Sequence, residues 1–309
     1  MNRVYGVIGI KSIMANWNAD FSGYPKTISD GSIFGSDKAL KYSIKKYWED
    51  RGEKILYIKS FKTDKGKIRP RSLEERYNQV FDTTLTKKDE STVILKNLFS
   101  ALDVKSFGAT FAEEGNNISL TGVVQIGQGF NVYEDSSAEE QQILSPFRSD
   151  KKPKEGKETE EANQSTLGTK IVSDEAHYLY PFYINPTSYR DYVDMKVTEG
   201  YTEEDYKKFK EGALLGATAL NTNAKAGCEN EFALFVETDE ETYLPNLTQF
   251  MKFEKGEDKD ILTLNLEEIL QGIEDDIKKI EIYYNDYKLK LNNIPKGAVL
   301  FNIFTRKEV

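Results

Sequence analysis

Residues 134–166 constrain the possible folds of this chain more than any other stretch. They carry many charges of both signs and few apolar side chains, so they cannot supply a hydrophobic core. We predict that this segment is a mobile insertion. No internal repeat is visible, and the insertion does not separate two autonomous halves. We therefore expect one domain over residues 1–309, with a core drawn from both flanks.

The flanking segments predict strands and helices in alternation. Residues 3–13 are rich in Val and Ile and favour a strand. Ser36 is a good N-cap for a helix over 37–51. Further helices are expected near 91–102 and 203–220, and residues 264–285 are expected to form a helix that runs into a strand. Residues 62–72 are expected to form a basic turn region. Further strands are expected over 54–61, 106–127 (two strands and a hairpin turn), 170–186 and 229–240.

This succession of elements predicts an α+β protein. The first half has the order strand, helix, strand, helix, strand, strand. That order loosely matches a ferredoxin-like sheet, which runs strand, helix, strand, strand, helix, strand. Chain order alone leaves the topology open.

Basic residues concentrate in one region, although the chain is acidic overall. The net charge is −9, whereas residues 36–71 hold twelve Lys or Arg and five acidic residues. Residues 237–276 hold thirteen acidic residues and three lysines. This distribution excludes a uniformly basic nucleic-acid binder. It predicts that a polyanion is attracted to one region and repelled by the other.

Composition also limits the chemistry and the compartment. No apolar run approaches the length of a membrane span and the N-terminus lacks a signal-peptide pattern, so we expect a cytoplasmic protein without a membrane partner. Cys228 and His177 are the single cysteine and histidine. They exclude a disulfide framework and a zinc site built on several Cys or His residues. We expect His177 to be a packed residue, and we predict no metal and no cofactor.

The long loop at 15–35 and the helix after it are the strongest candidates for a binding surface. Loops of this length inside a compact domain are usually functional or disordered. The helical spacing puts three lysines on one face, apart from the apolar face: Lys38, Lys41 and Lys45. Before them, an aromatic ring stands between two amides: Asn16, Trp17 and Asn18. Lysines neutralise phosphates and aromatic rings stack on unpaired bases, so this combination fits single-stranded RNA or DNA.

Three blocks make the chain similar to a known family. They are YGVIGIKSIMANWNADFSGYPK near the N-terminus, DVKSFGATFAEEGNNISLTGVVQIGQG at 103–129, and STLGTKIVSDEAHYLYPFYINP at 165–186, followed by YTEEDYKKFKEGAL. They resemble the multi-copy backbone subunit of type I CRISPR surveillance complexes, the Cas seven family, and most closely its type I-B branch. The resemblance covers about two-thirds of the chain.

The resemblance implies a non-catalytic scaffold with a modified ferredoxin-like (RRM-type) palm, a finger-like insertion and a flexible thumb, placed at 130–168. It implies that copies polymerise along a CRISPR RNA beside other Cascade subunits. The RNA then pairs with target DNA, in antiviral defence or in RNA-guided transposition. The candidate RNA-binding residues are Lys11, Ser12, Asn16, Trp17, Asn18, Lys38, Lys41, Lys45, Lys46, Gln125, Gln128, Thr166 and Lys170.

Two enzymatic alternatives remain open. Backbone subunits of type III complexes resemble this fold and cut target RNA with a loop aspartate and a metal ion, which would make Asp20 or Asp30 the candidate. Both aspartates also suit ordinary turns. A CRISPR RNA-processing endoribonuclease could use His177 as its base.

Overall fold

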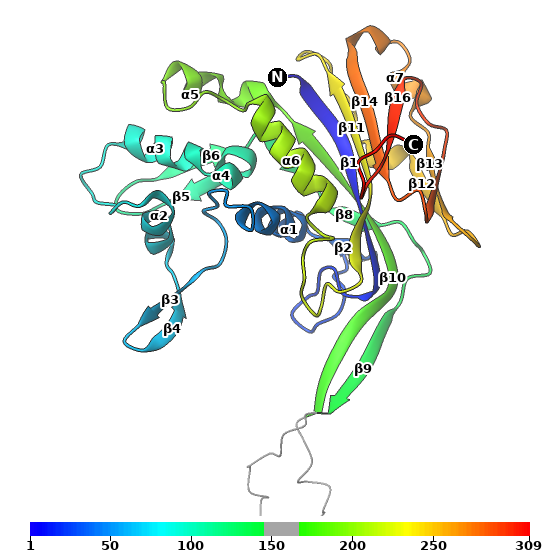
Figure 1. The fold of residues 1–309 in the computed structure, drawn as a ribbon, viewed down its shortest axis with the longest axis horizontal. Helices are drawn as coiled ribbons and strands as arrows, with labels where there is room; N and C mark the ends of the chain where they lie inside the picture. Colours follow the sequence, from blue (N-terminus) through cyan, green and yellow to red (C-terminus); the bar gives the residue numbers. More distant parts are fainter. Residues whose placement is uncertain (145–166) are drawn as a thin grey trace, which may run out of the picture.

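The structure is a computed structural model that describes residues 1–144 and 167–309. In these parts of the chain, nine strands form one sheet (Figure 1). Its order is β16 (Ala298–Asn302), β14 (Ile277–Tyr284), β11 (Cys228–Thr238), β1 (Arg3–Ala15), β10 (Leu167–Ile184), β8 (Gly129–Asn131) and β2 (Phe34–Gly35), while β7 (Val124–Ile126) and β9 (Ala138–Leu144) also pair with β10. The protein is therefore mixed α+β.

The first strand, β1, lies at the centre of the sheet and confirms the prediction for residues 3–13. It runs antiparallel to both β10 and β11. Its side chains alternate between two cores: Val4 and Ile8 pack on one face, and Tyr5 and Val7 on the other. Burial of both faces explains why the strand is apolar almost throughout.

Two helices cover one face of this sheet (Figure 1): α1 (Asp37–Glu49) and α6 (Glu203–Leu215). Ser36 caps α1 as predicted. Thr202 and Asp205 form a capping box at the start of α6, the helix predicted near 203–220. Gly212 of α6 allows the two helices to approach closely, because a Cβ atom there would lie 2.8 Å from Cγ2 of Ile44.

A smaller sheet covers the opposite face, and it consists of β12 (Met251–Glu254), β13 (Asp260–Leu264) and β15 (Leu289–Asn292). Leucines of this sheet join Tyr5 and Val7 in the second core. The helix expected over 264–285 is shorter than predicted: α7 (Glu267–Leu270) is followed by a 3-10 turn, η4 (Glu274–Asp276), before β14 begins.

Residues 54–121 form a lobe of short elements beside the helical face (Figure 1). These elements are β3 (Phe61–Asp64), β4 (Lys67–Pro70), α2 (Leu73–Phe81), α3 (Ser91–Ser100), α4 (Leu102–Phe107), β5 (Gly108–Phe111) and β6 (Ile118–Thr121). The helix expected near 91–102 is confirmed, and so is the hairpin expected within 106–127. The β3–β4 hairpin and α2 were not predicted.

The strand expected over 54–61 is wrong. Ile55 and Leu56 are buried, which accounts for the apolar pattern. However, the backbone N–H groups of Leu56 and Tyr57 donate to the carboxylate of Asp103, at 2.8 and 2.7 Å. A side chain of α4 therefore takes the place of a partner strand, which a local pattern cannot reveal.

A two-stranded arm projects from the sheet on the same side as the β3–β4 hairpin (Figure 1). It consists of β9 paired with residues 167–173 of β10. The ends of the insertion predicted at 130–168 are thus regular strands, and residues 145–166 lie outside the described residues. The remaining short elements are α5 (Arg190–Asp194), η2 (Pro186–Tyr189) and η3 (Leu247–Phe250). Among the described helices, none combines the length and the apolar character needed to cross a membrane.

Candidate nucleic-acid interface

Trp17 anchors the 15–35 loop to the sheet. Its side chain is fully buried, and its Nε1 donates a hydrogen bond of 2.6 Å to Oη of Tyr180 on β10. Burial raises the pKa of Tyr180 well above its usual value, so the phenol stays protonated. Gly35 makes this packing possible, because a Cβ atom there would lie 1.9 Å from Tyr180 Oη. The expectation that Trp17 offers a stacking surface for bases is therefore wrong.

The two asparagines beside Trp17 also act within the loop. Asn16 is buried, and its Nδ2 donates to the carbonyl oxygens of Gly23 and Ile171, at 2.8 and 3.3 Å. Oδ1 of Asn18 accepts from the backbone N–H of Ser36 at 2.8 Å. These amides close the loop onto the arm and onto the start of α1. They shape the surface rather than form its exposed part.

Lys225, which is not among the predicted site residues, completes this anchor. Its Nζ donates to the carbonyl oxygens of Asn16 and Trp17, each at 2.6 Å. Burial lowers the pKa of Lys225. The lysine is 208 residues from Trp17 in sequence, so no local signal links the two.

The lysines of α1 do not form one free face, which corrects the expectation from their spacing. Lys41 pairs with Asp37 at 2.9 Å, and Nζ of Lys45 donates to the carbonyl oxygen of Tyr57 at 2.6 Å. Burial lowers the pKa of Lys45. Lys38 alone of these three is exposed. The helical period places the three side chains together, but the 54–121 lobe covers Lys45.

Lys46 and the two candidates on β1 also have partners within the chain. Lys46 pairs with Glu49 and Asp50, at 3.1 and 2.6 Å. Ser12 is fully buried, and its hydroxyl donates to the carbonyl oxygen of Ala15. Lys11 contacts Glu175 and Asp260, at 3.8 and 3.4 Å. Ser12 and Lys11 are thus enclosed, whereas Lys46 stays at the surface, where two acidic residues pair with it.

The other candidates lie nearer the surface. Gln125 is exposed and donates to the carbonyl oxygen of Gly122, and the exposed Gln128 exchanges hydrogen bonds with Asp37 at the start of α1. Lys170 is half-buried on β10, opposite Gln141 in the arm. Thr166 lies outside the described residues.

His177 is fully buried, as expected for a packed residue. Its Nδ1 lies 2.7 Å from Glu231 and its Nε2 lies 3.0 Å from Glu175, while Phe253 of the smaller sheet packs on the ring. Burial opposes the charged imidazole, but the two carboxylates outweigh this effect and raise the pKa of His177. A ring enclosed in this way cannot reach an RNA backbone, which argues against the base of an endoribonuclease.

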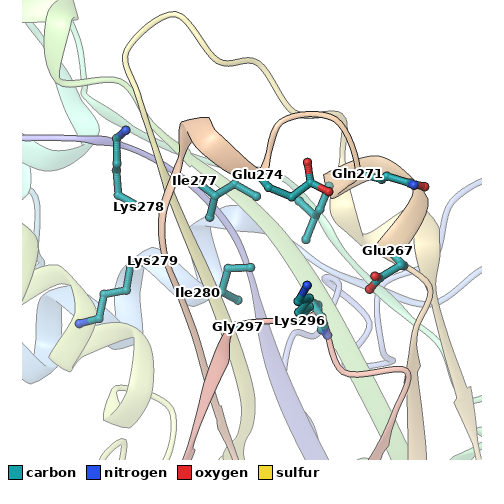
Figure 2. A pocket seen from close by; sticks show the side chains of 11 residues that line it. Glu267, Gln271, Glu274, Ile277, Lys278, Lys279, Ile280, Lys296 and Gly297 are labelled. Carbon is teal, nitrogen blue, oxygen red and sulfur yellow. The ribbon is translucent and has the colours of Figure 1, made fainter.

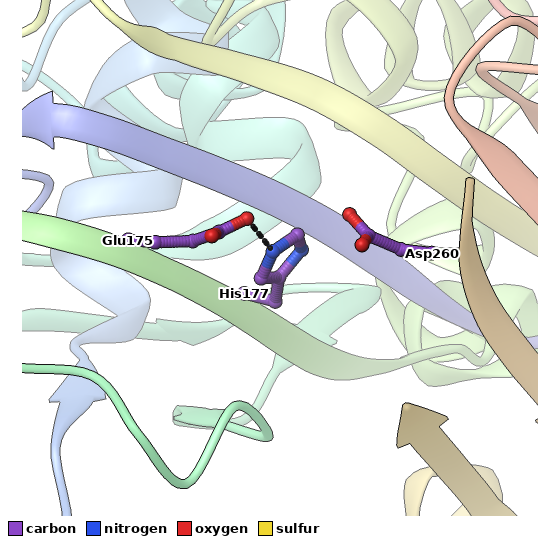
Figure 3. Close-up of side chains that lie close together, drawn as sticks. All are labelled: Glu175, His177 and Asp260. Atoms are coloured by element: carbon purple, nitrogen blue, oxygen red, sulfur yellow. Dashed lines mark hydrogen bonds and ion pairs between the residues drawn. The ribbon is translucent and has the colours of Figure 1, made fainter. Parts of the chain in front are cut away.

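Glu175, His177 and Asp260 form a cluster that could in principle hold a cation (Figure 3). Their ligand atoms lie within 4.8 Å of one another. However, Lys11 contacts both carboxylates, and Lys255 lies 2.6 Å from Glu175 and 3.2 Å from Asp260. Since two ammonium groups already neutralise these acids, we interpret the cluster as an ion-pair network that joins the two sheets.

The two loop aspartates occupy ordinary turns. Oδ1 of Asp20 accepts hydrogen bonds from the backbone N–H groups of Ser22 and Tyr24, at 2.8 and 3.1 Å. Oδ1 of Asp30 accepts from the N–H of Ser32 at 2.8 Å. This bond lowers the pKa of Asp30. Both carboxylates are thus used by their own turns.

A pocket of about 350 Å³ lies beside α7, at the end of the sheet away from the arm (Figures 1 and 2). Apolar side chains such as Ile277 and Ile280 form part of its lining. Its charged residues are of both signs: Glu267, Glu274, Lys278, Lys279 and Lys296. This mixture gives no preference for a polyanion, so the pocket is not part of the candidate interface.

Comparison with known proteins identifies the family. The family model described as "CRISPR-associated protein Cas7" matches residues 2–288. The comparison with curated proteins finds no match. Among solved structures, a chain of a "CRISPR RNA-guided surveillance complex, pre-nicking" is similar at 14% identity and a TM-score of 0.46, covering 78% of this chain and 80% of that one.

Two further solved structures are similar at lower scores. A chain of a "CRISPR RNA-guided surveillance complex" has 15% identity and a TM-score of 0.40, with 77% of this chain and 71% of that one covered. A chain of a type III-B Cmr-beta complex bound to cognate target RNA has 9% identity and a TM-score of 0.40, with 76% and 61% covered. TM-scores below 0.5 add nothing to the family match. Because that match spans nearly the whole sequence, the chain belongs to the family of CRISPR-associated protein Cas7.

Proposed function

We propose that this protein is a non-catalytic backbone subunit of a type I-B CRISPR surveillance complex. Copies of the chain bind side by side along a CRISPR RNA, with other Cascade subunits, and present its bases to target DNA. The protein contacts the RNA backbone, and base pairing supplies the sequence specificity. The observation that carries this proposal is the family match over residues 2–288.

The strand order supports a ferredoxin-like palm. Along the sheet, β11, β1, β10 and β8 are neighbours, α1 follows β1, and α6 follows β10. With β8 counted as the second strand, this is the 4-1-3-2 order of a strand-helix-strand-strand-helix-strand unit. The arm is then part of the thumb, and the 54–121 lobe is the finger-like insertion.

The candidate RNA surface is the exposed part of the 15–35 loop together with the first turn of α1. Lys38 and Gln128 offer exposed polar groups there, and Lys170 lies on the neighbouring arm. Gln125 is exposed on β7. Trp17, Asn16 and Asn18 hold this surface in shape. We assign them a positioning role, because Nδ2 of Asn16, Nε1 of Trp17 and Oδ1 of Asn18 are hydrogen-bonded within the protein.

The test is the stoichiometry of the protein on guide RNAs of increasing length, measured by light scattering after gel filtration. We expect the number of copies per RNA to rise with RNA length. A constant 1:1 complex, or no binding, would overturn the proposal.

Incubation of this complex with complementary RNA and Mg²⁺ or Mn²⁺ tests the enzymatic alternative. We expect no cleavage. Cleavage that disappears in Asp20→Ala or Asp30→Ala would replace the scaffold by a metal-dependent endoribonuclease.

A further inference from the structure

The β3–β4 hairpin is a projection whose two faces differ. It extends from the 54–121 lobe toward the same side as the arm (Figure 1). Its register pairs Phe61 with Pro70, Lys62 with Arg69, Thr63 with Ile68, and Asp64 with Lys67. Since cross-strand partners share a face, apolar and basic residues alternate between the two faces of the hairpin.

One face is attached to α2 by charged contacts. Glu75 accepts hydrogen bonds from Lys62 and from both terminal nitrogens of Arg69, the latter at 2.8 and 2.7 Å. Arg69 also contacts Asp64 at 3.1 Å. Ser72, the N-cap of α2, is bonded to Glu75 in a capping box. These contacts use the cations near the base of the hairpin and fix its direction.

The opposite face and the tip are exposed. Phe61 is 53% exposed and Ile68 is 77% exposed. Lys59 before the hairpin and Lys65 and Lys67 at its tip are exposed as well, although the register gives Lys67, the partner of Asp64, the same parity as Lys62 and Arg69. None of the three forms an ion pair within residues 1–144 and 167–309. Nζ of Lys59 lies 5.1 Å from the centre of the Phe61 ring. Exposed apolar side chains that share one face and are rimmed by polar or charged residues are typical of interaction sites.

We propose that this face, together with the tip of the hairpin, binds an unpaired nucleic-acid strand, at a site separate from the 15–35 loop. Phe61 stacks on a base, and Lys59, Lys65 and Lys67 contact the flanking phosphates, the combination by which proteins bind single strands without sequence preference. The charge supports a polyanion, because the cations that face α2 are neutralised and those at the tip are not. This inference rests on the proposed function and adds a second contact to it.

Fluorescence anisotropy with labelled oligo-U RNA and oligo-dT DNA of equal length, at several salt concentrations, tests the site on the full chain. We expect Lys65→Ala/Lys67→Ala to make the slope of log K against log salt shallower by up to about 1.4 units, since each phosphate contact on a single strand contributes about 0.7. Phe61→Ala should weaken binding about 5-fold or more and leave the salt slope unchanged.

The matched control is Lys87→Ala/Lys88→Ala, which removes the same charge from another exposed part of the same lobe. It should change neither affinity nor slope, and all variants should melt like the unsubstituted protein. A loss with RNA, with DNA or with both supports the site and identifies the strand that occupies it.

Four results would overturn the inference. If the unsubstituted protein binds and the hairpin variants bind equally well, the hairpin site fails while the proposed function stands. If the hairpin variants lose self-association but keep nucleic-acid affinity, the face is a protein interface. If the Lys87→Ala/Lys88→Ala control weakens binding as much as the hairpin variant does, the weaker binding results from the loss of positive charge in general and not from a site on the hairpin. Absence of any binding by the unsubstituted protein refutes this inference and the proposed function together.

Discussion

Replacement of Trp17 distinguishes a role in anchoring the 15–35 loop from a direct contact with RNA. The side chain is fully buried against Tyr180, so Trp17→Ala removes a large aromatic group from a closed site. Such truncations reduce the free energy of unfolding by about 3 to 5 kcal/mol. Trp17→Phe keeps most of the apolar contact and loses the hydrogen bond of 2.6 Å, which leaves the buried Tyr180 hydroxyl without this partner. We expect that variant to lose about 1 to 3 kcal/mol.

Urea unfolding followed by circular dichroism measures these losses, and anisotropy with guide RNA measures affinity in buffer where each variant is folded. Trp17→Phe should bind RNA like the unsubstituted protein, because the ring does not reach the surface. If Trp17→Phe unfolds at the same urea concentration as the unsubstituted protein yet binds RNA weakly, the ring contacts RNA and the anchoring role is refuted.

Three further predictions concern other parts of the molecule. Lys38→Ala should keep the melting temperature and make the slope of log K against log salt for guide-RNA binding shallower by about 0.7. Lys45→Ala should lower the free energy of unfolding by about 1.5 to 3 kcal/mol, because it removes a charged donor to a backbone carbonyl. Equal melting temperatures of the two variants would contradict this difference. The raised pKa of His177 means that its contribution to stability is complete below its unfolded pKa of about 6.5 and is lost as the pH rises through the folded pKa. Urea unfolding at a series of pH values should therefore give a flatter profile for His177→Gln, and an unchanged profile would exclude His177 as the titrating group. Deletion of residues 136–163 removes β9 but leaves the pairing of β10 with β1. Circular dichroism should therefore show a folded protein, and this protein should bind guide RNA more weakly. An unfolded deletion variant would show that the arm belongs to the core.

Much of the fold follows from short-range patterns. The apolar run in β1, the Ser36 cap of α1 and the capping box of Thr202 and Asp205 each depend on residues only a few positions apart. Such features are set by backbone conformation and local hydrogen bonding, so the sequence reveals them. The strand predicted over 54–61 is wrong, because an apolar pattern reports the burial of Ile55 and Leu56 and not the partner of the backbone N–H groups.

The roles of the candidate site residues depended on partners far away in sequence. The sequence alone placed Trp17 and the lysines of α1 in one region, but Trp17 is covered by Tyr180, 163 residues away, and the carbonyl groups beside it are bound by Lys225. Lys45 is engaged by a carbonyl group of the 54–121 lobe. A side-chain pattern predicts which face a residue occupies, but whether that face meets water, a carbonyl group or an aromatic ring is decided only when distant segments pack. Burial then determines which lysines stay free to neutralise phosphate, because a cation bonded inside the protein must lose that partner before it can bind another.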